Sequence, residues 1–102
     1  MALPAFSSPA ATTDTLVYTV PAGKNAAVSI NVAALLACTA KIAITGGTAP
    51  GASHWLESGR ALGVGDTMER SGVYLGPGCR VYINSSVANG LSAQVYGIEE
   101  SV

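Results

Sequence analysis

Charged side chains are scarce in this sequence. Lys, Arg, Asp and Glu make up 11% of its 102 residues, whereas soluble domains carry about 25%. Five basic and six acidic residues give a net charge of −1. This balance provides no strong attraction for nucleic acid or an anionic membrane, so we expect neither as a partner. A surface so poor in charge resists self-association weakly, and we expect another subunit to cover much of it.

Histidine is almost absent as well. His54 is the only one, so a catalytic relay that needs an imidazole would have to pass through it. No nucleophile elbow surrounds it, and the glycines form neither GxGxxG nor GxxxxGK[ST]. The carboxylates show no spacing typical of metal ligands or of a glycosidase acid pair. The sequence therefore predicts a non-enzymatic protein without metal or cofactor, in which His54 is a surface or packing side chain.

Long apolar runs and cysteine motifs are also missing. No stretch reaches the roughly 18 apolar residues of a membrane-spanning helix. The first 14 residues lack the basic and continuous apolar regions of a signal peptide, so we expect synthesis in the cytoplasm. Cys38 and Cys79 have no CxxC spacing and are interpreted as two small buried side chains. A disulfide between them stays open as an alternative.

What the sequence does contain is period-two alternation of apolar and polar residues. Leu16, Tyr18 and Val20 alternate with other side chains, and Val28, Ile30 and Val32 do the same further on. Similar short segments recur, with Gly- and Pro-rich turns every 8 to 12 residues. The pattern predicts an all-β chain of seven or eight strands, folded as a small antiparallel β-sandwich or jelly-roll-like barrel. Segments 33–40, 45–53 and 59–66 are predicted to be connections.

Two Pro/Gly turns resemble each other. Residues Pro21–Lys24 suit a type II turn with proline in the second position, which predicts a hairpin that places Tyr18 and Lys24 at one end of a sheet. The second turn, Gly-Pro-Gly at 76–78, also leads into an alternating strand. Similar hairpins can arise from sandwich geometry alone, so no duplication is inferred.

The N-terminal region differs from the rest. Residues 1–13 combine Pro, Ser, Thr and Ala without periodicity, which indicates an extended arm rather than a strand or a helix. Residues 14–102 form the single β-sandwich domain. Leu3, Pro4 and Phe6 give the arm a small apolar anchor. We expect the arm to be mobile in the free subunit and to become ordered against a neighbouring subunit or a capsid.

Aromatic residues are few and lie within or next to predicted strands. Four Tyr and one Trp could cover a subunit interface, or they could form a platform for carbohydrate, and the interface is the favoured interpretation. The candidate assembly residues are Leu3, Phe6, Tyr18, Trp55, Tyr82 and Tyr96.

Several short motifs, taken in order, carry a resemblance. V-P-A-G-K at 20–24, W-L-E at 55–57, E-R-S-G at 69–72, V-Y-I-N-S-S at 81–86 and V-Y-G-I-E-E at 95–100 resemble small virion structural proteins of tailed bacteriophages. The resemblance covers roughly residues 14–100. It implies β-sandwich subunits that decorate capsids or build head and tail appendages, commonly as trimers and without catalysis.

The resulting expectation is a capsid decoration (cement) protein. We expect a homotrimer that binds the major capsid protein on the outer surface of the virion. The alternative is a head or tail fibre module, or a receptor-binding module, that recognises a glycan on the host surface.

Overall fold

The computed structural model describes residues 3–102, which form eight β-strands. The predicted all-β class is confirmed. The segment 59–62, predicted to be a connection, instead extends a strand, as do residues 33–34 and 38–40. The strands are β1 (Ala5–Ser7), β2 (Thr15–Thr19), β3 (Lys24–Ala34), β4 (Cys38–Thr45), β5 (Trp55–Leu62), β6 (Thr67–Leu75), β7 (Arg80–Ser85) and β8 (Leu91–Ser101).

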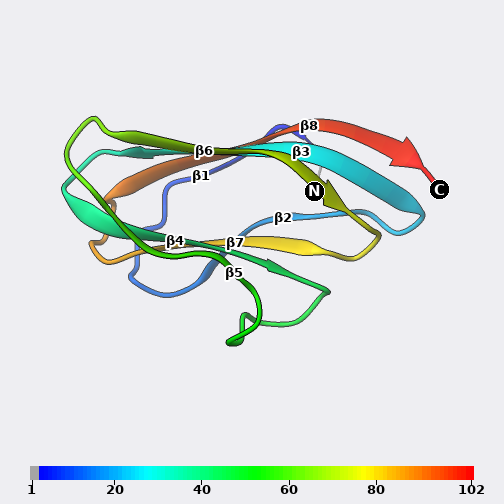
Figure 1. Ribbon diagram of the computed structural model, residues 1–102, viewed down its shortest axis with the longest axis horizontal. Coiled ribbons are helices and arrows are strands. Elements are labelled where there is room, and N and C mark those ends of the chain that lie inside the picture. Colours follow the sequence, from blue (N-terminus) through cyan, green and yellow to red (C-terminus); the bar gives the residue numbers. More distant parts are fainter. Residues whose placement is uncertain (1–2) are drawn as a thin grey trace.

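The strands form two antiparallel four-stranded sheets packed face to face (Figure 1). Sheet A has the order β1-β8-β3-β6, and sheet B has the order β2-β7-β4-β5. Every connection except the one between β4 and β5 passes from one sheet to the other. This alternation between two sheets is the jelly-roll arrangement, in which the inner faces of both sheets build one core.

The core follows directly from the alternation in the sequence. In β3, every second residue from Ala26 to Ala34 is buried, and the residues between them are partly exposed. Sheet B supplies the opposite layer through Ile42, Val81 and Ile83, which are all 0% exposed. Because successive side chains of a strand point to opposite faces, each strand has one core side and one outer side.

The predicted hairpin at Pro21–Lys24 is wrong. β2 lies in sheet B and β3 in sheet A, so the turn joins the two layers and does not pair its flanking strands. The amide of Lys24 donates to the carbonyl of Pro21 at 3.2 Å, which makes proline the first residue of the turn and not the second. Gly23, the third residue, has φ 75°, a conformation that glycine adopts without strain.

The two similar Pro/Gly turns lie side by side. The amide of Val20 donates to the carbonyl of Cys79 at 2.9 Å, and the amide of Gly78 donates back to the carbonyl of Val20 at 3.0 Å. The turn between β6 and β7 also crosses between sheets. The resemblance of the two segments therefore reflects two neighbouring crossovers at one end of the sandwich.

The N-terminal region is not purely an arm. Residues 5–7 form strand β1, which pairs with β8 at the edge of sheet A, opposite residues 93–95. Ala5 is buried, and Leu3 packs against the core. The amide of Asn89 donates to the carbonyl of Pro9 at 2.9 Å. The prediction that this segment forms no strand is thus wrong, because a three-residue strand needs no periodicity of its own when an existing edge supplies its hydrogen bonds.

The two cysteines lie at opposite ends of the sandwich. Cys38 begins β4, whereas Cys79 lies next to Arg80, which pairs with the other end of β4 at Thr45. Seven residues of strand separate these ends by about 23 Å, and a disulfide needs Cα atoms within about 7 Å. Both thiols are free and partly buried, so the open alternative of a disulfide within one chain is excluded.

Candidate functional site

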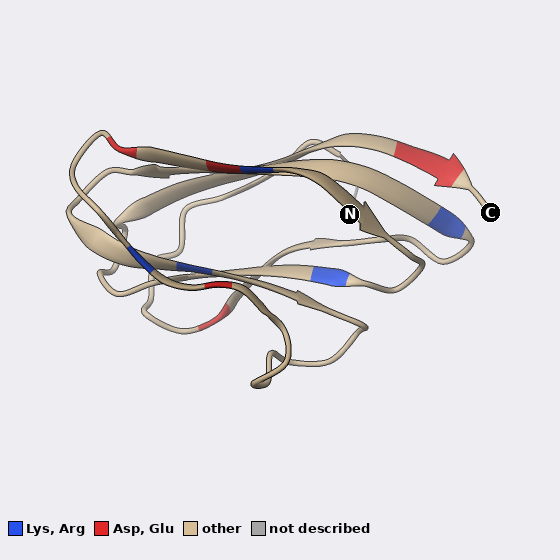
Figure 2. Cartoon of the chain, in the orientation of Figure 1, with Lys and Arg blue, Asp and Glu red and all other residues tan. Residues whose placement is uncertain are grey.

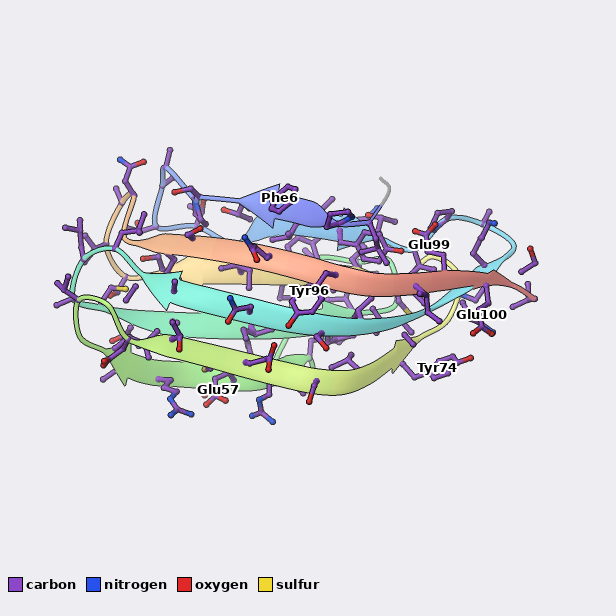
Figure 3. All side chains as sticks on the ribbon, turned by 90° about the horizontal axis from the view of Figure 1, so that it is seen from above. Phe6, Glu57, Tyr74, Tyr96, Glu99 and Glu100 are labelled. Carbon is purple, nitrogen blue, oxygen red and sulfur yellow. The ribbon has the colours of Figure 1, made fainter. Side chains whose placement is uncertain are left out.

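Four of the large hydrophobic side chains that are exposed lie on the outer surface of sheet A. We call this surface face A and define it by the outward-facing residues of β1, β8, β3 and β6. Its exposed large side chains are Phe6 and Tyr74 at 67%, Ile98 at 60% and Tyr96 at 39%. Figure 3 shows face A from above, with Phe6, Tyr74 and Tyr96 labelled.

The register of the strands explains how these side chains are spaced. Ile98 on β8 pairs with Ala27 on β3, which pairs with Tyr74 on β6. In the neighbouring row, Tyr96 pairs with Ser29. The central strand β3 therefore contributes only small side chains between the large ones. Face A is consequently low in relief, with apolar groups spread across the width of the sheet.

The charges on face A are all negative. Glu69 on β6 and Glu100 on β8 face outward, and no Lys or Arg of the described strands lies between them on this face. The hydroxyl of Tyr96 donates to the carboxylate of Glu69. This hydrogen bond is the main reason why the pKa of Tyr96 is raised above its usual value. The pair fixes one aromatic ring and one carboxylate on the surface.

The outer surface of sheet B, called face B, is built differently. A row across it runs from Trp55 through Ala43 and Tyr82 to Leu16. Tyr82 is only 8% exposed although it points away from the core, and Ala43 is 0% exposed. Neighbouring side chains on the same face therefore cover most of this row. The loop between β4 and β5 also stands out on the outer side of sheet B (Figure 1).

The charges on the strands of face B are positive. The ammonium of Lys41 lies 5.1 Å from the centre of the Trp55 ring, a cation–π contact. Arg80 Nη1 donates to the hydroxyl of Tyr82 at 3.1 Å. Asp14 lies at the rim, where its carboxylate accepts from Asn84 at 3.0 Å. Figure 2 shows the positions of all these charges on the chain.

A third aromatic residue, Tyr18, lies inside the sandwich. Its side chain is 0% exposed, and its hydroxyl donates to the carboxylate of Glu99. Burial, together with this carboxylate, raises the pKa of Tyr18 well above the usual value for tyrosine. Since Tyr18 belongs to β2 of sheet B and Glu99 to β8 of sheet A, the hydrogen bond joins the two sheets.

His54, the histidine considered for a catalytic relay, belongs to a local turn. The imidazole Nδ1 of His54 accepts from the amide of Gly51 at 2.8 Å, which closes a turn before β5. In residues 3–102, no three His, Cys, Asp or Glu side chains gather in a way that could hold a metal ion, and no pocket forms. Within the same range, no helix is long and apolar enough to cross a membrane.

The predicted assembly residues fall into three groups. Phe6 and Tyr96 lie on face A, and Trp55 and Tyr82 lie on face B. Leu3 is partly buried against the core and Tyr18 is 0% exposed, so both support the fold.

Two exposed residues of face A, Tyr74 and Ile98, are missing from the six candidate assembly residues. Ile98 lies two residues beyond Tyr96, so period-two alternation could have identified it. Tyr74 is one of the four tyrosines considered for an interface, but its high exposure depends on the position of β6 at the edge of sheet A.

The comparisons with known proteins add no assignment. No protein-family model matches the sequence, and no curated protein matches it either.

Proposed function

We propose that this chain is a capsid decoration protein of a tailed bacteriophage, which binds the outer surface of the capsid as a homo-oligomer and stabilises it. The sequence motifs that resemble small phage virion proteins support this proposal. The jelly-roll arrangement is compatible with it, since viral capsid proteins share this architecture, but lectins and cupins do as well.

Face A carries the proposal. It presents Phe6, Tyr74 and Ile98 on a surface of low relief with very little charge. Exposed apolar surface of this kind is typical of protein interaction sites, and aromatic residues are enriched in such sites. Small molecules generally bind in concave pockets, and residues 3–102 form none. A second protein surface is therefore the occupant that best fits face A.

Glycan binding by a fibre or receptor-binding module is the second candidate. An exposed ring such as Tyr74 could stack on a sugar, and lectins also use jelly rolls. However, the partners of Tyr74 in its row are Ala27 and Ile98, which supply no polar group for sugar hydroxyls. The ring of Trp55 already contacts Lys41. Protein docking is therefore the stronger proposal.

Co-sedimentation with expanded phage capsids that lack their decoration protein tests the proposal. We expect the purified protein to bind these capsids with saturable stoichiometry and to raise their melting temperature. Unexpanded procapsids serve as the control and should bind less. Failure to bind expanded capsids, together with binding to host-surface glycans on an array, would replace capsid decoration with the receptor-binding function.

A further inference from the structure

We infer that face A of one copy packs against face B of a second copy. The inference rests on the proposed function, because that proposal treats face A as a protein-docking surface and the inference names the partner that docks there. It is carried by three properties of the described residues, namely the area of the two faces, their matching apolar rows and their opposite charges.

The area of face A is close to what a stable contact needs. Strands lie about 4.8 Å apart and rise about 3.3 Å per residue, so the strands of sheet A cover about 500 Å² in projection. Side chains that stand out from the sheet increase the accessible area above this value. Stable interfaces bury about 800 Å² per partner. One sheet face and its rim are therefore large enough for one contact between copies.

The apolar parts of the two faces have the same layout. On face A, Ala27 lies between Ile98 and Tyr74 in one row across the sheet. On face B, Ala43 lies between Trp55 and Tyr82 in a corresponding row. Stacked sheets pack about 10 Å apart through interdigitating side chains. Because Ala43 and Tyr82 are covered by their neighbours, the large groups of face A would pack on the partly exposed Trp55 and Leu16 at the two ends of this row.

The charges favour packing face A on face B over packing face A on face A or face B on face B. Face A carries carboxylates on its strands, Glu69 and Glu100, whereas the strands of face B carry Lys41 and Arg80. Packing A on A would bring carboxylates together, and packing B on B would bring cations together. Like charges across an interface cost several kcal/mol. The combination of A with B is the one in which opposite charges face each other.

A contact between two different faces is heterologous. Each copy then offers a free face A and a free face B, so that further copies can add in the same sense. The assembly closes into a ring, such as a trimer, when the rotation between copies divides a full turn, and otherwise it continues as a row. A symmetric two-fold dimer would instead use the same face twice.

Two variants that each block one face test the inference. In the first, Tyr74→Ser and Ile98→Ser remove the apolar anchors of face A. In the second, Lys41→Glu and Arg80→Glu reverse the charge of face B. Sedimentation velocity at micromolar concentration should show the unmodified chain as an assembly larger than its 10.2 kDa monomer. Each variant alone should associate at least about tenfold more weakly.

Mixing the two variants is the decisive step. The first variant keeps face B and the second keeps face A, so the mixture should form a one-to-one complex and nothing larger. Leu36→Ser with Val64→Ser removes similarly exposed apolar groups from loops, and Arg60→Glu reverses an exposed charge on β5. These controls should assemble as the unmodified chain does. Thermal unfolding identifies a misfolded variant, and Lys41→Glu alone then replaces the second variant.

The outcomes separate this inference from the proposed function. A chain that stays monomeric, or variants that form no complex when mixed, overturns the inference. If that monomer still binds expanded capsids, capsid decoration stands without the contact between copies. If the chain assembles through faces A and B but does not bind capsids, the inference stands and the proposed function falls.

Discussion

Faces A and B have closely similar rows of side chains but very different exposure. In each, an alanine lies between two large residues, yet Tyr74 on face A is 67% exposed and Tyr82 on face B is 8% exposed. The difference follows from strand order. Tyr74 lies on the edge strand β6 and has a neighbour on one side only, whereas Tyr82 lies on β7 between β2 and β4. The exposure of an outward aromatic residue therefore depends on the position of its strand in the sheet.

The same comparison explains the roles of the charges. On face B, Arg80 and Lys41 contact Tyr82 and Trp55 and help to cover them. On face A, Glu69 accepts a hydrogen bond from Tyr96 but leaves the ring 39% exposed. Face B thus has much of its aromatic surface covered within one chain, whereas face A leaves its apolar groups available to a partner.

Replacing Gly97 should have the largest effect, because it disrupts the strand pairing beneath face A. A Cβ atom at this position would lie 2.0 Å from the carbonyl oxygen of Ala27, and φ is 148°. We expect Gly97→Ala to lower the free energy of unfolding by about 3–5 kcal/mol, measured by urea denaturation. Gly76→Ala is the matched control, since a Cβ there has nothing within 4 Å. Equal stability of both variants would contradict the close approach of β8 to β3.

Truncating the aromatic residues tests the contrast between the faces directly. Tyr82→Ala should cost about 3 kcal/mol of unfolding free energy, because the ring is nearly inaccessible. Tyr74→Ala should change it by no more than about 0.5 kcal/mol, since an exposed side chain loses few contacts. Both values come from urea denaturation at a protein concentration at which the chain is monomeric. Similar costs for the two substitutions would show that the two faces do not differ in coverage.

The two Tyr–Glu pairs refine the comparison between interior and surface. Tyr18→Phe should cost about 2 kcal/mol, because it leaves the carboxylate of Glu99 without its buried donor. Tyr96→Phe, which removes the equivalent hydrogen bond on face A, should cost less because water can replace the donor. Urea denaturation at neutral pH measures both. A larger cost for Tyr96→Phe would contradict the assignment of the buried pair as the stronger one.

The pH dependence of stability follows from the same pairs. The pKa of Tyr18 is raised in the folded chain, so the native state holds this proton more tightly than the unfolded state does. Its contribution to stability is complete below the unfolded pKa of about 10 and is lost as the pH rises above that value. The fall in melting temperature between pH about 8 and pH about 11 should therefore be smaller for Tyr18→Phe than for the unmodified chain. If the melting temperature of Tyr18→Phe fell as much over this pH range as that of the unmodified chain, the raised pKa of Tyr18 would be contradicted.

The smallest effect is expected at the ion pair between the sheets. Arg70 on β6 donates to the carboxylate of Glu57 on β5 at 2.7 Å, but its side chain is 42% exposed. Exposed pairs contribute about 0.5 kcal/mol. Glu57→Gln should therefore lower the unfolding free energy by about this amount at low salt and by less at high salt. A loss that is insensitive to salt would indicate a structural role for Glu57 other than the ion pair.

The sequence by itself determined the β class and most strand positions, because alternation is a local property. In β3, the pattern from Ala26 to Val32 predicts both the strand and its buried side. The Pro/Gly segments likewise mark where strands end. They do not show which sheet receives the next strand, so the pattern at Pro21–Lys24 predicts a hairpin where the chain in fact crosses between sheets.

Only the tertiary structure decided how strands distant in sequence lie together. The pairing of β1 with β8, more than 80 residues apart along the chain, gives residues 5–7 their strand conformation. The order of strands in each sheet places Tyr74 at an edge and Tyr82 in the middle. It also places Glu99 next to Tyr18. Such pairings depend on long-range hydrogen bonds and packing, which no local periodicity records.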